Sequence, residues 1–234
     1  MKTKCLFIVT TCLLVIFNSA SAQITGFRAG ANIANLLDKD DDYVYSDEYK
    51  SRTGINLGLT LAVPISDNLH FETGAFYSNK GFQYEVEEMY EGSLMEVSAV
   101  VKTQYIDIPL TMKSIYDLGS NHIFLTYGFY AGIGVSGKME LSARYQGESH
   151  SETLNILWGP DDQDHFKGFD FGLNAGAGAN LDGFIIEARY GHGLANISPT
   201  RDNGAVFRNR VISVLVGFQL SKKNAEKEEF QLLK

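Results

Sequence analysis

The sequence predicts an all-β fold, an eight-stranded antiparallel up-and-down transmembrane β-barrel, and three observations support it. Apolar residues recur with period two from residue 25 to residue 220, which is the alternation of strands and not the 3.6-residue period of helices. The alternating segments are long enough to cross a hydrocarbon layer, which takes about 9–11 tilted residues. The connections alternate between short turns and long polar loops, as in bacterial outer-membrane barrels.

The N-terminal segment predicts export. Two lysines precede an apolar run over 5–17, and small residues follow up to Ala22. This is the layout of a Sec signal peptide over 1–22, with cleavage before Gln23. A membrane-anchoring helix is the alternative, but the apolar run is too short and lacks a basic flank downstream.

Composition narrows the class of the mature chain. Both cysteines, Cys5 and Cys12, fall within the signal segment, so neither a disulfide framework nor a thiolate metal site is expected. The negative net charge, formally −8 for the full sequence, and the lack of a basic stripe argue against nucleic-acid binding. No second apolar run is long enough for a transmembrane helix, so the chain is expected to span a membrane only as a closed barrel.

One domain suits a mature chain of this length, a barrel over 23–220 with a charged periplasmic tail over 221–234. The predicted strands are 25–34, 52–63, 69–80, 98–113, 122–137, 168–180, 184–193 and 209–220. Short turns are expected at 64–68, around 117–121 and at 181–183, and long loops at 35–51, 81–97, 138–167 and 194–208. With eight strands, both termini fall on the short-turn side, the periplasm.

Alternation alone does not say which face of the strands points inward. A soluble lipocalin-like barrel would turn the apolar face inside and a charged face toward water. Here the less apolar face is mostly Gly, Asn, Ala, Thr and Ser, which fill a narrow lumen well and solvate a surface poorly. The apolar face ends in aromatic residues, as an interfacial girdle would: Phe27, Phe71, Tyr77, Phe169, Phe184, Tyr190 and Phe218. The sequence therefore favours apolar side chains that face lipid.

Five blocks, taken in their order and spacing, resemble the PorT-like family of outer-membrane β-barrel proteins of Bacteroidota. They are GFRAGAN (26–32), FETGAFYSNKG (71–81), YIDIPL (105–110), GLNAGAG (172–178) and EARYGHGLANI (187–197). The resemblance implies an eight-stranded barrel in the outer membrane of a Gram-negative bacterium, in a family mostly without assigned activity. A few relatives are linked to the secretion of surface proteins, and no family motif carries catalytic residues. The charged tail departs from the pattern, because such chains often end on an aromatic residue at the strand terminus.

Charged residues on the inward face are the main candidate site. They are Arg28, Glu72, Asp107, Asp170, Glu187 and Arg189. Charges in a narrow lumen are costly unless they are paired, so we expect a structural network in which the two arginines bridge the carboxylates. Paired carboxylates also serve acid–base catalysis, but a lumen filled by side chains admits no substrate.

Three further motifs have plainer interpretations. Gly132–Gly137 matches the dinucleotide fingerprint G-x-G-x-x-G, yet no helix is expected to follow it, so strand glycines are favoured. The acidic segment Asp38–Asp42, with Asp47 and Glu48, offers oxygen ligands for Ca²⁺. An EF-hand loop that begins at Asp38 needs Gly at its sixth position and Glu at its twelfth, and the chain has Tyr at both, so a solvated loop is favoured. A hydrolytic site on the loop side could use a serine, a histidine and an aspartate, but the sequence contains no nucleophile motif such as G-x-S-x-G. The candidate residues are Ser149, His150, Ser151, Asp164, His165 and His192.

These observations predict a non-enzymatic protein of the outer membrane with no cofactor. Its expected partners are membrane lipid and lipopolysaccharide, with a protein or surface polymer at the extracellular loops. Those loops carry exposed aromatic residues of the kind that binding surfaces use: Tyr43, Tyr45, Tyr49, Tyr84, Tyr90, Tyr145 and Trp158. A structural or interaction barrel is the first functional expectation. An accessory of a secretion system and a soluble periplasmic binding barrel are the alternatives.

Overall fold

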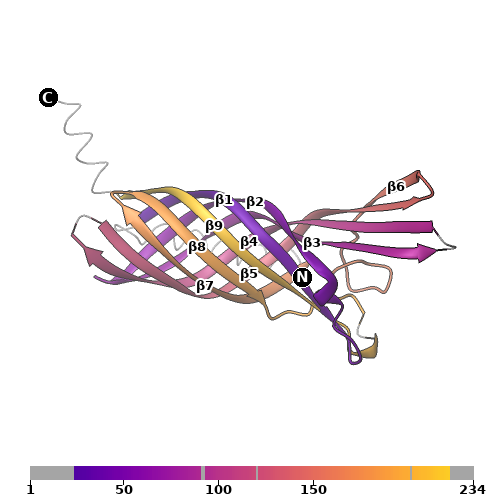
Figure 1. Cartoon of the computed structure of the whole chain (residues 1–234). Helices are drawn as coiled ribbons and strands as arrows, with labels where there is room; N and C mark the ends of the chain where they lie inside the picture. Colours follow the sequence, from indigo (N-terminus) through magenta and orange to yellow (C-terminus); the bar gives the residue numbers. More distant parts are fainter. Residues whose placement is uncertain (1–23, 91–92, 120, 201, 222–234) are drawn as a thin grey trace.

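A computed structural model describes residues 24–90, 93–119, 121–200 and 202–221 (Figure 1). The predicted signal peptide (1–22) and all but the first residue of the predicted tail lie outside these described residues. Nine strands and two single-turn 3-10 helices form within them. They are β1 (Ile24–Lys39), η1 (Tyr45–Glu48), β2 (Tyr49–Ser66), β3 (Leu69–Tyr90), β4 (Ser93–Leu118), β5 (Asn121–Tyr145), β6 (Glu148–Asn155), β7 (Phe169–Leu181), β8 (Phe184–Gly193), η2 (Asp202–Gly204) and β9 (Val206–Ser221).

Eight of the strands close into a ring, and the predicted fold class is confirmed. The strand order is β4-β3-β2-β1-β9-β8-β7-β5-β6, and an additional pairing between β4 and β5 completes the barrel. Every neighbouring pair is antiparallel. The seam between the first and last strands is continuous from Ile24↔Ser221 to Lys39↔Val206. Closure leaves the eight strands of the ring without a free edge across the membrane.

One end of the barrel, called the turn end here, carries short connections at the three predicted places. β2 and β3 are joined by 67–68, β4 and β5 by 119–120, and β7 and β8 by Asp182 and Gly183. The last two residues have φ of 51° and 93°, the left-handed conformations of a type I′ hairpin turn, which a Gly at the second position favours. Both chain ends of the barrel meet at this end, since Ile24 pairs with Ser221.

The opposite end, called the mouth, differs from the sequence prediction. Residues 81–97 were expected to form a loop, but β3 and β4 continue as a hairpin in which Phe82 pairs with Val101 and Met89 with Leu94. The predicted loop 138–167 is also partly wrong, because β5 runs on to Tyr145 and turns into β6. The outer parts of β3, β4, β5 and β6 extend beyond the ring in Figure 1. We call residues 83–90, 93–100, 139–145 and 148–155 the projecting sheet.

The two faces of the barrel strands differ as their composition predicts. Large apolar side chains point outward and stay exposed, for example Leu59 at 60%, Phe169 at 59% and Phe218 at 59%. Polar and small residues point inward, where Arg28 and Glu187 are each only 1% exposed. Such an arrangement places hydrocarbon against apolar side chains and leaves the polar groups to pair with one another. Among the described residues, no helix has the length and apolar character needed to span a membrane.

Candidate functional site

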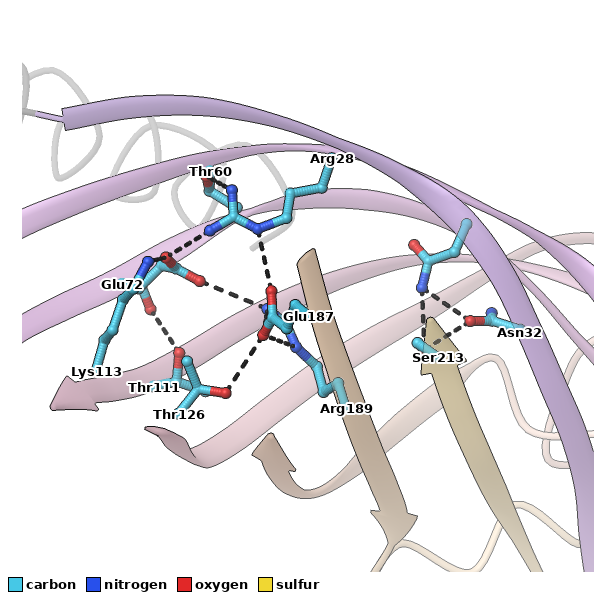
Figure 2. Close-up of polar contacts among 11 residues, drawn as sticks. Arg28, Asn32, Thr60, Glu72, Thr111, Lys113, Thr126, Glu187, Arg189 and Ser213 are labelled. Carbon is cyan, nitrogen blue, oxygen red and sulfur yellow. Dashed lines mark hydrogen bonds and ion pairs between the residues drawn. The ribbon is translucent and has the colours of Figure 1, made fainter. Parts of the chain in front are cut away.

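Five charged side chains from four strands form one buried cluster in the lumen. Arg28 on β1 donates from Nε to Glu187 on β8 at 3.0 Å and from Nη2 to Glu72 on β3 at 3.2 Å. Arg189 donates from Nη2 to Glu187 at 2.8 Å and to Glu72 at 3.5 Å. Lys113 on β4 lies 3.3 Å from the same glutamate, Glu72. Figure 2 shows the three cations converging on the two carboxylates, so each carboxylate is shared.

A second buried cluster is centred on Lys80 of β3. Its Nζ lies 2.9 Å from Asp107 Oδ1 on β4 and 3.1 Å from Asp170 Oδ2 on β7. Tyr130 and Asn209 also donate to Asp170 Oδ2, at 3.1 and 2.9 Å. The ammonium lies 4.8 Å from the centre of the Tyr130 ring, within the range of a cation–π contact. One lysine therefore holds two carboxylates from strands that do not pair with each other.

The six charged residues expected in the lumen all lie there, but they divide between two clusters. Arg28 and Arg189 contact Glu72 and Glu187, whereas Asp107 and Asp170 pair with Lys80. The sequence reasoning did not select Lys80 or Lys113. Both occupy alternate positions that face inward: Lys80 lies an even number of residues from Glu72 on β3, and Lys113 lies an even number from Asp107 on β4. Counting alternate positions along each strand therefore finds both lysines.

The two clusters together contain equal numbers of positive and negative groups. The cations are Arg28, Lys80, Lys113 and Arg189, and the carboxylates are Glu72, Asp107, Asp170 and Glu187. Charges removed from water are tolerated when they are paired and hydrogen-bonded. The interior is therefore compact and close to neutral, which is unlike the one-signed lining of an ion-selective pore.

A small cavity of about 40 Å³ separates the clusters. Lys80, Asp107 and Arg189 contribute to its wall, together with Asn56 and Asn174. The amide oxygens of both asparagines are buried and accept no hydrogen bond from a described residue. A cavity of this size has room for about three water molecules, which are suitable donors for such oxygens. It is far below the roughly 300–1,000 Å³ of a small-molecule site.

An apolar cluster closes the lumen at the mouth. Its members, called the mouth cluster, are Leu36, Phe82, Val101, Ile156, Phe166 and Ile197. The loop over 156–168 crosses the opening and is held by backbone hydrogen bonds, from Lys167 N to Ile197 O at 2.8 Å and from Ile156 N to Gly137 O at 2.9 Å. Trp158 of this loop packs edge-on against Tyr105, with ring centroids 5.4 Å apart. Above the ion pairs, the barrel therefore ends in a packed apolar lid.

The glycine motif lies within a strand. Gly132, Gly134 and Gly137 belong to β5 and pair across the sheet with β4, and the strand continues directly after them to Tyr145 instead of giving way to a helix. A Cβ on Gly134 would approach the Trp158 ring to 2.5 Å, so this glycine leaves room for the lid. The motif lacks the helix N-terminus that binding of a dinucleotide pyrophosphate requires.

The acidic first loop is ordered by its own hydrogen bonds. Asp40 Oδ1 accepts from the backbone N–H groups of Asp42 and Tyr43, at 2.9 and 2.8 Å, and Asp40 Oδ2 accepts from the Tyr45 hydroxyl. The two backbone donors, followed by the hydroxyl, lower the pKa of the exposed Asp40 carboxyl. Within the described residues, no group of three or more Asp, Glu, His or Cys side chains is arranged to hold a metal ion.

The structure does not bring the hydrolytic candidates together. Ser149, His150 and Ser151 lie on β6, while His192 lies on β8 beside Tyr190. His165 Nδ1 accepts the Leu157 backbone N–H at 3.0 Å, and Asp164 binds the backbone of its own turn. Among the described residues, no hydrogen bond joins a serine of this set to a histidine of the set, so the arrangement offers no nucleophile–base pair.

A closed antiparallel ring with apolar side chains outside and ion-paired side chains inside defines an outer-membrane β-barrel protein. The protein resides in the outer membrane, in contact with its lipid. The chain belongs to the family described as "outer membrane protein beta-barrel domain", whose model matches residues 21–198. No curated protein matches it significantly.

The chain also matches solved structures at low identity, among them the outer membrane protein OprG. OprG of Pseudomonas aeruginosa has a TM-score of 0.38 and 12% identity, covering 85% of this chain and 96% of that one. Ail, the attachment invasion locus protein of Yersinia pestis, has a TM-score of 0.34 and 13% identity, covering 84% and 98%. Neisserial surface protein A has a TM-score of 0.32 and 11% identity, covering 82% and 96%. The family match, and not these distant likenesses, carries the assignment.

Proposed function

We propose that this protein is a non-conducting and non-enzymatic barrel that acts as a structural or interaction protein at the cell surface. In this proposal the projecting sheet and the mouth loops face outward and contact lipopolysaccharide and a protein or surface polymer. One observation supports it above the others: the lumen is filled by paired charges that sum to neutrality and is covered by the mouth cluster. Among the described residues, the lumen cavity between the two ion-paired clusters measures about 40 Å³, which supports a function carried by surfaces outside the ring.

The proposed orientation follows from the asymmetry of the connections. Outer-membrane barrels place their short turns in the periplasm and their longer connections outside. Here the turn end carries two-residue connections, and the mouth carries the projecting sheet and the loop over 156–168. The long end is therefore the one available to partners in the surroundings of the cell.

Single-cysteine labelling in intact cells tests this orientation. The expected mature chain, from Gln23 on, contains no cysteine, so Ser149→Cys on β6 and Asp67→Cys in a short turn each introduce a single thiol, both at exposed positions. A membrane-impermeant maleimide is expected to label Ser149→Cys in intact cells and Asp67→Cys only after the outer membrane is opened. The reverse pattern contradicts the proposal, and recovery of the protein in the soluble periplasmic fraction favours the lipocalin-like alternative.

A role as a PorT-like accessory of protein secretion is the second candidate. It is favoured by the five sequence blocks, of which 26–32, 71–81 and 187–197 contain Arg28, Glu72 and the Glu187–Arg189 pair of the lumen. Deleting the gene and comparing the secreted and outer-membrane protein profiles separates the candidates. Loss of surface cargo supports a secretion role. An unchanged profile with altered adhesion supports the interaction role.

A further inference from the structure

The outermost strand of the projecting sheet has an open edge. Within the described residues β6 pairs with β5 and with no other strand. Gln146 and Gly147, which join the two strands, have φ of 49° and 85°, the geometry of a type I′ turn. In such a hairpin the residues flanking the turn, Tyr145 and Glu148, form a hydrogen-bonded pair, and paired positions then alternate along the ladder.

This alternation determines which backbone groups of β6 are available. Residues 148, 150, 152 and 154 direct their N–H and C=O groups toward β5, because they occupy the hydrogen-bonded positions. Ser149, Ser151 and Thr153 direct theirs away from β5, toward the open edge. All three side chains are exposed, so water and partners reach these backbone groups. An edge with regularly spaced free donors and acceptors is a template for one more strand.

The side chains along this edge carry unneutralised negative charge. Glu148 and Glu152 stand opposite Tyr145 and Leu141 of β5, on the face that continues the inner face of the barrel. Among the described residues, no cation lies within ion-pair distance of either glutamate. By contrast, the acidic residues Glu85 and Glu140 are matched by lysines. Among the described residues, Glu148 and Glu152 on the open edge therefore lack positive partners, as do Glu87 and Glu88 on β3.

A groove runs across the projecting sheet next to this edge. Its volume is about 380 Å³, and it crosses all four strands, from Glu85 and Glu87 on β3 to His150 on β6. Val86, Val97 and Ala143 form its apolar floor, in register from β3 to β5. Arg144 of β5 also lines the groove and lies 3.9 Å from Glu96. The apolar stems of long basic side chains suit the floor, on the face that also carries Glu148 and Glu152.

We propose that the open edge of β6 binds an extended peptide segment with lysine or arginine at alternate positions, which adds to the projecting sheet as a further strand. Its basic side chains lie on the inner face beside Glu148 and Glu152. Its other side chains lie on the outer face beside Ser149 and Ser151, which accept small polar or β-branched neighbours. This inference rests on the proposed function, since it requires the projecting sheet to be accessible outside the cell.

A second copy of the chain is the less suitable occupant of the edge. Two barrels in one membrane share their orientation, so their β6 strands run parallel when they lie side by side. The two-fold axis that relates two such copies exchanges the faces of the sheet, so Glu148 and Glu152 of one copy lie beside Ser149 and Ser151 of the other, which offer no positive charge. A basic segment supplies the positive partners that a second copy lacks.

Fluorescence anisotropy with designed peptides tests the proposal on the folded barrel in lipid nanodiscs. The probe is a fluorescein-labelled peptide of ten residues in which lysine and threonine alternate, and its control replaces lysine by glutamate. The lysine peptide is expected to bind at least tenfold more tightly than the glutamate peptide. N-methylation of every second residue of the lysine peptide removes its strand donors and is expected to weaken binding at least tenfold, without any change to the protein.

Two protein variants separate strand addition from simple charge attraction. Ser151→Pro removes an outward N–H and leaves the ladder with β5 intact, so it is expected to weaken binding at least tenfold, whereas the matched Ser151→Ala leaves it unchanged. Glu148→Gln with Glu152→Gln is expected to weaken binding and flatten its salt dependence. Equal binding by Ser151→Pro and Ser151→Ala, or equal binding of the N-methylated and plain peptides, overturns the proposal, as does self-association of barrels through β6.

The outcome distinguishes this inference from the proposed function beneath it. If Ser149→Cys is labelled in intact cells and the lysine peptide fails to bind, the outward interaction surface stands and strand addition at β6 is wrong. If Ser149→Cys is protected in intact cells, both proposals fail together.

Discussion

Removing Glu187 is the sharpest test of the lumen network. This carboxylate accepts from Arg28 Nε at 3.0 Å and from two nitrogens of Arg189, at 3.0 and 2.8 Å. In Glu187→Ala, Glu72 is the only carboxylate left to both guanidiniums, and it also serves Lys113. Three buried cations would then share one carboxylate. Breaking a buried ion pair by deleting one partner costs about 3–5 kcal/mol, so a loss of this size in the free energy of unfolding is expected.

Urea unfolding of the barrel in lipid vesicles measures this loss, with the mobility of unheated samples on gels as the readout. Glu152→Ala removes an exposed carboxylate outside the network and is expected to stay within about 0.5 kcal/mol of the wild type. Glu187→Ala combined with Arg189→Ala removes one charge of each sign, so the pair is expected to lose about 0.5–3 kcal/mol less than the sum of the single variants. A Glu187→Ala barrel as stable as the Glu152→Ala control would refute the reasoning.

Three further outcomes are expected. Ile197, in the mouth cluster, is 1% exposed, so Ile197→Ala is expected to lower the free energy of unfolding by about 2–5 kcal/mol. It is also expected to increase the quenching of Trp158 fluorescence by acrylamide, and unchanged quenching contradicts a packed lid over the lumen. Gly217→Ala would place a Cβ 1.9 Å from the Phe27 carbonyl oxygen at the β1–β9 seam, so the free energy of unfolding is expected to fall by about 1–3 kcal/mol. A urea midpoint equal to that of the wild type would count against so close an approach of the two strands. Because the loop's own donors hold the pKa of Asp40 below its ordinary 3.8, their stabilisation is present above about pH 4 and is lost as the pH falls below it. The protection factors of the loop amides, which are exchange rates corrected for the pH dependence of intrinsic exchange, are therefore expected to fall at pH 3 in the wild type and to be already low at pH 7 in Asp40→Ala.

The ring of the barrel was predictable because lipid and lumen impose opposite demands on alternate residues. Leu57 and Leu59 face lipid while Asn56 and Thr60 face the interior, and this contrast repeats in each strand that crosses the membrane. The signal disappears where both faces of a strand meet water. β6 has the sequence ESHSETLN, in which seven of the eight residues are exposed, so its polarity has no period and the sequence predicts a loop there.

The lumen was predictable in content but not in pairing. Counting alternate positions along a strand identifies the charged residues that face inward. The same counting finds Lys80, although polar residues surround it in the sequence. Which carboxylate each cation meets depends on the stagger of strands around the closed ring. Arg28 and Glu187 are 159 residues apart, and no local pattern relates them. The mouth cluster escaped the sequence reasoning for the same reason, since Leu36 and Ile197 meet only after the loops fold across the opening.

Conductance in planar lipid bilayers tests the central claim most directly, which is that this barrel is closed and works through its outer surfaces. Purified mature protein is inserted under a voltage ramp at high salt, after gel mobility has shown that the barrel is folded. The ion-paired interior and the mouth cluster predict no current above that of the lipid alone. Stable ohmic steps from the folded protein would contradict the account and return the search for function to the lumen.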